Sequence, residues 1–265
     1  MSINAHNEIK TVLTAAVRFK AKLPTDVEAK ARHALSLHND LTTASVADVT
    51  KELLELLGDP AAFDKALPDA LIQVARAEAL TKLRTQVVDQ AVNRARQRMA
   101  AEREAVTAAF GKALAPYIAT LTQNAGNLEP TFDPRYLDDL SNQQFAAWKE
   151  CAPALEAIEA AASALRWMYS INPDNILNPQ VVARLPFVSL PESLPDLKTT
   201  AAFVDSIDGR RVHGGTFTRP TADLHSFWPS RVIHAGGSLA FAGPAETQQR
   251  AARLRASHVD REVAA

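Results

Sequence analysis

The sequence contains few of the residue types and motifs that usually indicate a particular enzyme activity or metal site. Its 265 residues include one cysteine, which excludes an intrachain disulfide and a multi-cysteine zinc or iron–sulfur site. Only 22% of the residues are charged and the net charge is -1, which, with 47% apolar residues, argues against wholesale disorder and a global polyanion-binding surface. Nine glycines and 6% aromatic residues favour closely packed helices. No uncharged apolar run approaches the ~18 residues of a membrane span, and charges interrupt the only candidate signal segment. We expect no membrane association, and a location in the cytoplasm or within an intracellularly assembled particle.

Alanine is abundant instead, with 49 residues. It has the highest intrinsic helix propensity and lets helices approach closely. The composition therefore predicts a mainly α fold: a helical bundle with one very long, coiled-coil-like helix and a small C-terminal β-hairpin element.

Prolines, glycines and helix-capping residues divide the chain into segments. We expect a short-helix bundle over residues 1–58, a long helical arm over 60–125, a helical aromatic core over 126–184, a Pro/Gly-rich β-hairpin region over 185–245 and a basic helical tail over 246–265. Capping-box patterns predict helix starts at Thr25 and Ser141. The Asp208-Gly209 pair predicts a hairpin turn, since glycine adopts the positive dihedral angles that such a turn requires, and Gly236-Gly237 predicts a second hairpin.

The long helix is the most distinctive feature. No proline follows Pro68 until Pro116, which predicts one helix over residues 69–115, about 70 Å long. Its apolar residues are mostly three or four apart, as in helices that pair, although Glu78 and Glu102 interrupt strict heptads. The residues expected to carry self-association are Leu71, Leu83, Val87, Ala91, Ala95 and Met99. Because a lone rod would leave this stripe in water, we expect a homo-oligomer or a protein partner.

Basic residues on the same helix allow a second interpretation. A continuous arginine stripe could follow nucleic-acid phosphates, but the helix lacks stacking aromatics, so such binding should be weak and salt-dependent. Alternatively, the arginines meet the acidic segment 126–200 or a neighbouring subunit. The residues expected to contact an anion or a partner are Arg84, Arg94, Arg98, Arg210, Arg211 and Trp228.

Candidates for chemistry are few. His213, His225 and His234 could bind a metal in a metal-dependent enzyme, with Asp223 as a further ligand, but their spacing matches no metal motif and turn signals around them predict exposure. Cys151 lies in an alanine-rich helical stretch, which favours a buried structural thiol. The sequence also lacks phosphate-loop, nucleophile-elbow and zinc-protease patterns. We expect no catalytic residue, no metal and no cofactor.

These observations favour a non-catalytic assembly protein that self-associates or binds a protein partner through its long helix. By analogy of architecture alone, such a helix with an alanine seam is typical of virion or phage-type assembly components. The nucleic-acid-associated protein and the metal-dependent enzyme remain the alternatives.

Overall fold

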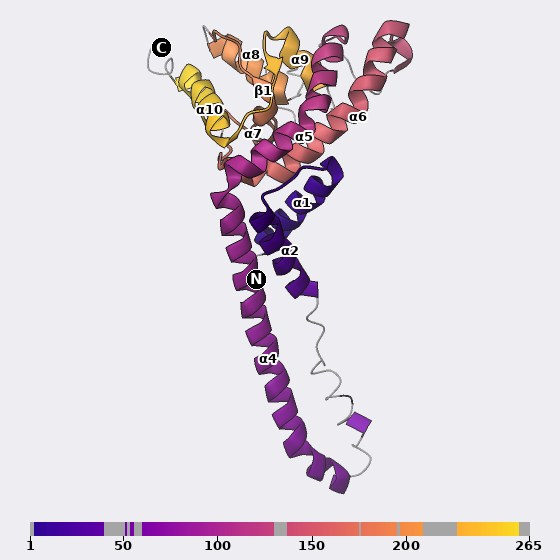
Figure 1. Ribbon diagram of the computed structural model, residues 1–265, viewed down its shortest axis with the longest axis vertical. Coiled ribbons are helices and arrows are strands. Elements are labelled where there is room, and N and C mark those ends of the chain that lie inside the picture. The colour runs from indigo at the N-terminus through magenta and orange to yellow at the C-terminus, as the bar shows by residue number, and fades with distance from the viewer. Residues whose placement is uncertain are drawn as a thin grey trace. The chain divides into compact units, whose positions relative to one another are not determined.

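The computed structural model describes residues 3–39, 51, 54–55, 60–129, 137–174, 176–194, 197–208 and 227–259. The α-helices are α1 (Ile3–Phe19), α2 (Thr25–Asn39), α4 (Pro60–Ala101), α5 (Arg103–Asn124), α6 (Asn142–Leu165), α7 (Pro179–Arg184), α8 (Leu197–Asp208), α9 (Trp228–His234) and α10 (Pro244–Val259) (Figure 1). Short 3-10 turns are η1 (Ala125–Asn127), η2 (Leu137–Asp139), η3 (Arg166–Tyr169) and η4 (Leu185–Phe187), and the strands are β1 (Val188–Ser189) and β2 (Ser238–Leu239). The predicted mainly α fold with a small β element is confirmed.

The chain forms two compact units that are interleaved in sequence. Unit 1 comprises residues 1–13 and 24–101, and unit 2 comprises residues 14–23 and 102–265. The first residues of α1 therefore belong to one unit and its last residues to the other. The five segments expected from composition remain a prediction.

Unit 1 is built around the packing of α2 on α4. From α2, Val27 and Ala31 are buried, and α4 buries Val92 and Met99. The α2 helix begins at Thr25, where the capping pattern predicts a start. The third short helix expected before residue 58 lies largely outside the described residues.

The long helix differs from its prediction at both ends. It begins at Pro60, so Pro68 lies inside α4 rather than in its first turn. It ends at Ala101, and Glu102 (φ -99°, ψ 19°) separates it from α5. The 42 residues of α4 span about 63 Å at about 1.5 Å per residue. The prediction of one continuous helix over residues 69–115 is therefore wrong, and the break falls at Glu102, one of the two residues that interrupt the heptads.

Unit 2 contains the α5–α6 pair and the aromatic core. Ser141 caps α6: its hydroxyl accepts from the Gln144 amide, and the Gln144 side chain accepts from the Ser141 amide, as predicted. Apolar residues of α5 and alanines of α6 are buried, including Phe110, Leu114, Ala157 and Ala161. The aromatic core extends beyond the predicted 126–184 segment, because Trp228, Phe187, Phe203 and Phe227 are also fully buried.

The two predicted hairpins are wrong. Residues 197–208 form α8, because Thr200, Phe203, Val204 and Ile207 have the spacing of one helical face and are all buried. Residues 228–234 form α9, with Pro229 in its first turn. The sheet instead joins β1 to β2 in antiparallel register, Val188 opposite Leu239. Only the strand after Gly237 matches the expected position.

Arg250 lies on α10, the predicted C-terminal helix, and links that helix to the sheet by hydrogen bonds. Its guanidinium is buried and donates to the carbonyl oxygens of Leu185, Val188 and Ala240, and it pairs with Glu246 at 2.6 Å. A two-residue strand pair supplies few hydrogen bonds of its own, so this side chain supports the β element.

Candidate functional site

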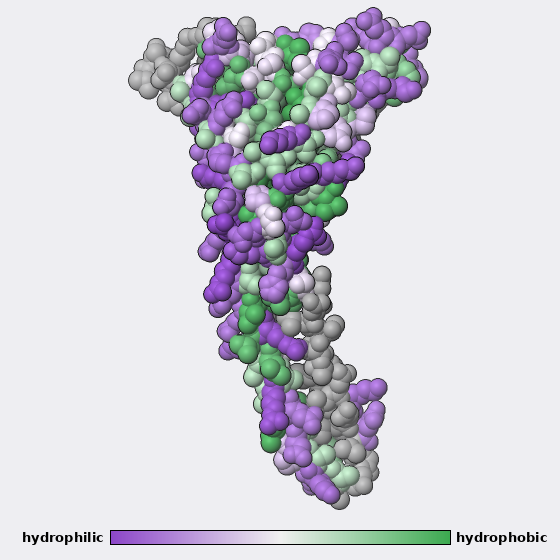
Figure 2. Space-filling view, in the orientation of Figure 1, coloured by the Kyte–Doolittle hydropathy of each residue, from purple (hydrophilic) through white to green (hydrophobic). Residues whose placement is uncertain are grey.

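The α4 helix carries most of the exposed large apolar side chains in the described part of the chain. Leu71, Ile72, Leu80, Leu83 and Val87 are 47% to 58% exposed. Figure 2 shows hydrophobic surface along the middle of α4, between charged groups. Scattered apolar side chains are normal on a protein surface, but a cluster on one helix marks an interaction site.

Four of these residues share one face. At about 100° per residue, Ile72, Leu80, Leu83 and Val87 fall within about 80° of the helix circumference. We call these four residues the exposed α4 face. The buried residues of α4, which are Ala70, Val88, Val92, Ala95 and Met99, cluster about 130° away. The buried apolar face thus lies mainly from Val88 to Met99, whereas the exposed α4 face lies on the preceding stretch, where no residue from 71 to 87 is buried.

The predicted self-association stripe does not follow a single face. Leu83 and Val87 are exposed, Ala91 is half-buried, and Ala95 and Met99 are buried. Each four-residue step overshoots a full turn by about 40°, so the stripe winds from the open face to the covered one. Ile72 and Leu80, which the prediction left out, complete the open face, and the mixed spacing of three and four residues was the signal for them.

Leu71 belongs to the predicted stripe but not to the exposed α4 face. It lies about 120° from Leu83 around the helix. Its exposure, 58%, nevertheless matches the 56% of Leu83.

Two of the α4 arginines are held within unit 1. Arg98 pairs with Asp26 at 2.8 Å, and Arg96 pairs with Glu8. Both of these carboxylates belong to the N-terminal helices. Because these ion pairs neutralise the charges of Arg96 and Arg98, the two residues would contribute less to a phosphate-binding stripe.

The other predicted contact residues have different surroundings. Arg94 is exposed, and Arg84 is half-buried, with an Nη1 atom that finds no hydrogen-bond partner among the residues that the structure describes. Trp228 lies in the core with 1% exposure, and its indole N–H donates to Glu159, so it presents no surface to a partner. Arg210 and Arg211 lie outside the described residues.

The histidine cluster can be assessed only at His234, since His213, His225 and Asp223 lie outside the described residues. His234 is exposed at the end of α9, not on a strand, and its Nδ1 lies 2.9 Å from the Ser230 carbonyl oxygen. Among the described residues, no three His, Cys, Asp or Glu side chains are grouped as a metal site requires.

Cys151 lies buried on α6. Burial, with a smaller contribution from the Glu150 charge, raises the pKa of its thiol to about 12. The thiolate, which is the nucleophilic form, is therefore scarce at neutral pH. This fits the structural role predicted for Cys151.

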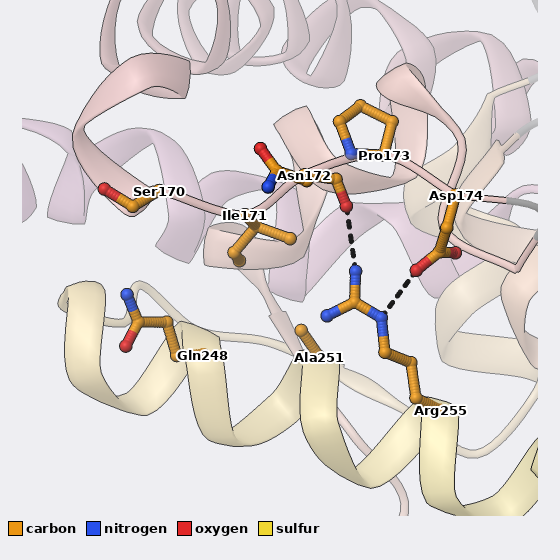
Figure 3. A pocket seen from close by; sticks show the side chains of 8 residues that line it. All are labelled: Ser170, Ile171, Asn172, Pro173, Asp174, Gln248, Ala251 and Arg255. Atoms are coloured by element: carbon orange, nitrogen blue, oxygen red, sulfur yellow. Dashed lines mark hydrogen bonds and ion pairs between the residues drawn. The ribbon is translucent and has the colours of Figure 1, made fainter.

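A cavity of about 340 Å³ lies between residues 170–174 and α10 (Figure 3). Arg255 donates through Nε to Asp174 at 2.6 Å and through Nη2 to the Asn172 carbonyl oxygen at 2.8 Å. The Asp174 carboxylate also accepts from the backbone amides of Ile176 and Leu177. The Arg255 guanidinium and the Asp174 carboxylate thus already have hydrogen-bond partners within the chain.

None of the helices in the described ranges has the length and apolar character that crossing a membrane requires. Comparisons with models of protein families, with curated proteins and with solved structures found no match to this chain. The exposed α4 face is therefore the candidate site on structural grounds alone.

Proposed function

We propose that this chain is a non-catalytic interaction protein that assembles through the exposed α4 face. The observation that carries the proposal is the grouping of Ile72, Leu80, Leu83 and Val87 on one side of a 42-residue helix, in a stretch that the described part of the chain leaves without a buried residue from position 71 to position 87. The setting is the cytoplasm or an intracellularly assembled particle, in keeping with a single buried cysteine.

The apolar contribution to binding can be compared with the cost of association. Burying the exposed half of each of these side chains would contribute about 1 kcal/mol, or about 4 kcal/mol per chain. Association costs roughly 4–15 kcal/mol in lost freedom. The face alone thus supports a weak to moderate complex, and polar contacts at its rim would strengthen it.

Site-specific photo-crosslinking in the cells that make the protein tests this function. A photoreactive phenylalanine analogue replaces Leu83, and in a matched variant it replaces Leu71, which is equally exposed on another face. We expect a discrete adduct from position 83, with its partner identified by mass spectrometry, and none from position 71. The adduct should disappear when Val87→Glu is added.

Absence of an adduct at position 83 would overturn the proposed function. A crosslink confined to the same chain would do so too, because it would mean that the chain itself covers the face.

A further inference from the structure

We propose that the partner of the exposed α4 face is a second copy of this chain, bound with the two α4 helices antiparallel. The inference rests on the proposed function and adds the identity and direction of the partner. It depends on the charges that lie at either end of the apolar face.

Those charges are Asp69 and Arg94. At about 100° per residue, both fall within the arc of the exposed α4 face, one before it and the other after it. Both are exposed, and neither forms an ion pair with a described residue of its own chain. Arg96 and Arg98, by contrast, are paired within unit 1.

The spacing of these charges defines a register. Asp69 precedes Leu80 by eleven residues, and Arg94 follows Leu83 by eleven residues. A two-fold axis midway between Leu80 and Leu83 therefore sets Leu80 opposite Leu83 of the second copy, and Asp69 opposite its Arg94. The symmetry repeats both contacts, as an isologous interface requires.

The same register accommodates the one remaining charge on the face. Arg76 would lie opposite Val87 of the second copy, where its aliphatic stem can cover the valine while its guanidinium reaches water. Ala79, beside Leu80, is small and exposed and would let the helices approach closely.

A parallel pair would be unfavourable. It would set Asp69 beside Asp69 and Arg94 beside Arg94 of the second copy, and facing like charges repel. The antiparallel pair turns both repulsions into attractions. Charge complementarity thus favours a second copy in one direction.

Sedimentation equilibrium of the purified full chain gives the first test. We expect a species of twice the chain mass, whose share of the protein rises with concentration. Leu83→Glu should weaken association at least about 30-fold, since it places a charge in the apolar contact. Leu71→Glu, about 120° away, should change it less than about 2-fold. A wild type that stays monomeric at about 1 mM would overturn the proposal.

Charge reversal tests the register. Asp69→Arg and Arg94→Asp should each weaken the dimer about 10-fold, because each change sets like charges together at two symmetric places. The double variant restores opposite charges and should return to within about 3-fold of wild type. Failure of this rescue, with the single effects present, would overturn the antiparallel register. Equal dissociation constants for all four proteins would overturn it as well.

The photo-crosslink at position 83 distinguishes failure of the proposed partner from failure of the proposed function. An adduct of twice the chain mass supports the second copy. An adduct with a different identified protein, together with a monomeric purified chain, would overturn the second copy and leave the proposed function in place.

Discussion

Trp228 and Glu159 lie 69 residues apart in sequence, and the indole N–H of Trp228 donates to Oε1 of Glu159 at 2.7 Å. The same oxygen accepts from Nε of Arg184 at 2.8 Å, and Nη1 of Arg184 donates to the carbonyl oxygens of Ile207 and Asp208. One carboxylate on α6 thereby connects α7, the end of α8 and the start of α9.

Replacing this carboxylate should destabilise unit 2. Glu159→Ala leaves the Trp228 N–H and the largely buried Arg184 guanidinium without their shared acceptor. We expect a loss of about 2–3 kcal/mol in the free energy of unfolding, measured with urea. Glu156→Ala, one turn away, breaks only an exposed pair with Arg18 and should cost under about 0.5 kcal/mol. Equal losses in the two variants would contradict this account.

Gly111→Ala should also destabilise unit 2. A Cβ atom at position 111 would lie 2.7 Å from Cδ1 of Phe241, whose ring packs edge-on against Phe187. Because the ring or the backbone must shift to admit the Cβ atom, the overpacking should cost about 1–3 kcal/mol. Gly126→Ala is the matched control, since its nearest neighbour would be 3.8 Å away. Thermal unfolding of both variants makes the comparison, and a stabilised Gly111→Ala would show that Phe241 yields easily.

Acid should weaken the contact between residues 170–174 and α10. Burial raises the pKa of Asp174, but hydrogen bonds from the Leu177 amide, Arg255 and the Ile176 amide outweigh it and hold the pKa below its ordinary value of 3.8. A carboxyl whose folded pKa is depressed contributes stability above its unfolded pKa and loses it as the pH falls through the folded pKa. Stability should therefore fall below about pH 4.

The Asp174→Asn variant provides the comparison. It should be less stable than wild type at pH 7, and the difference between the two proteins should shrink between about pH 4 and pH 2. Unfolding by urea at a series of pH values measures both quantities. A difference that stays constant with pH would exclude the carboxylate as its source.

Cys151 should resist thiol reagents in the folded protein. With a pKa of about 12, the buried thiol is almost wholly protonated at pH 8. We expect labelling at least about 100-fold slower than in urea-unfolded chain, where the one cysteine should react fully. Rapid labelling of native protein would show that α6 opens readily.

Local signals in the sequence predicted the starts of several helices. The capping box at Ser141 depends on neighbouring residues only, and it is present as expected. The signal at Asp208-Gly209 misled, because Phe203, Val204 and Ile207 suit a strand by type but a helix by spacing. Burial against the rest of unit 2 favours the helix, and residue type alone does not report that burial.

The candidate site shows a similar limit. The sequence predicted that α4 carries an apolar interaction face, but a stripe of four-residue steps winds around a helix. Which part of it stays open depends on how α4 packs in the folded chain, where Ala95 and Met99 are buried. Leu83 and Val87 remain from the prediction, and Ile72 and Leu80 join them on the exposed α4 face.

The interleaving of the two units has a consequence for synthesis. Within unit 2, Arg18 pairs with Glu156, 138 residues later, and Phe19 packs against Tyr117. At about 5–20 residues per second, a ribosome needs roughly 7–28 s to make the chain between Arg18 and its partner. The second half of α1 is therefore synthesised before its partners in unit 2. Phe19 stays uncovered until the residues that pack against it have been translated. Unit 2 can complete its core only late in translation, and a chaperone that binds nascent apolar segments would have time to engage the start of this chain.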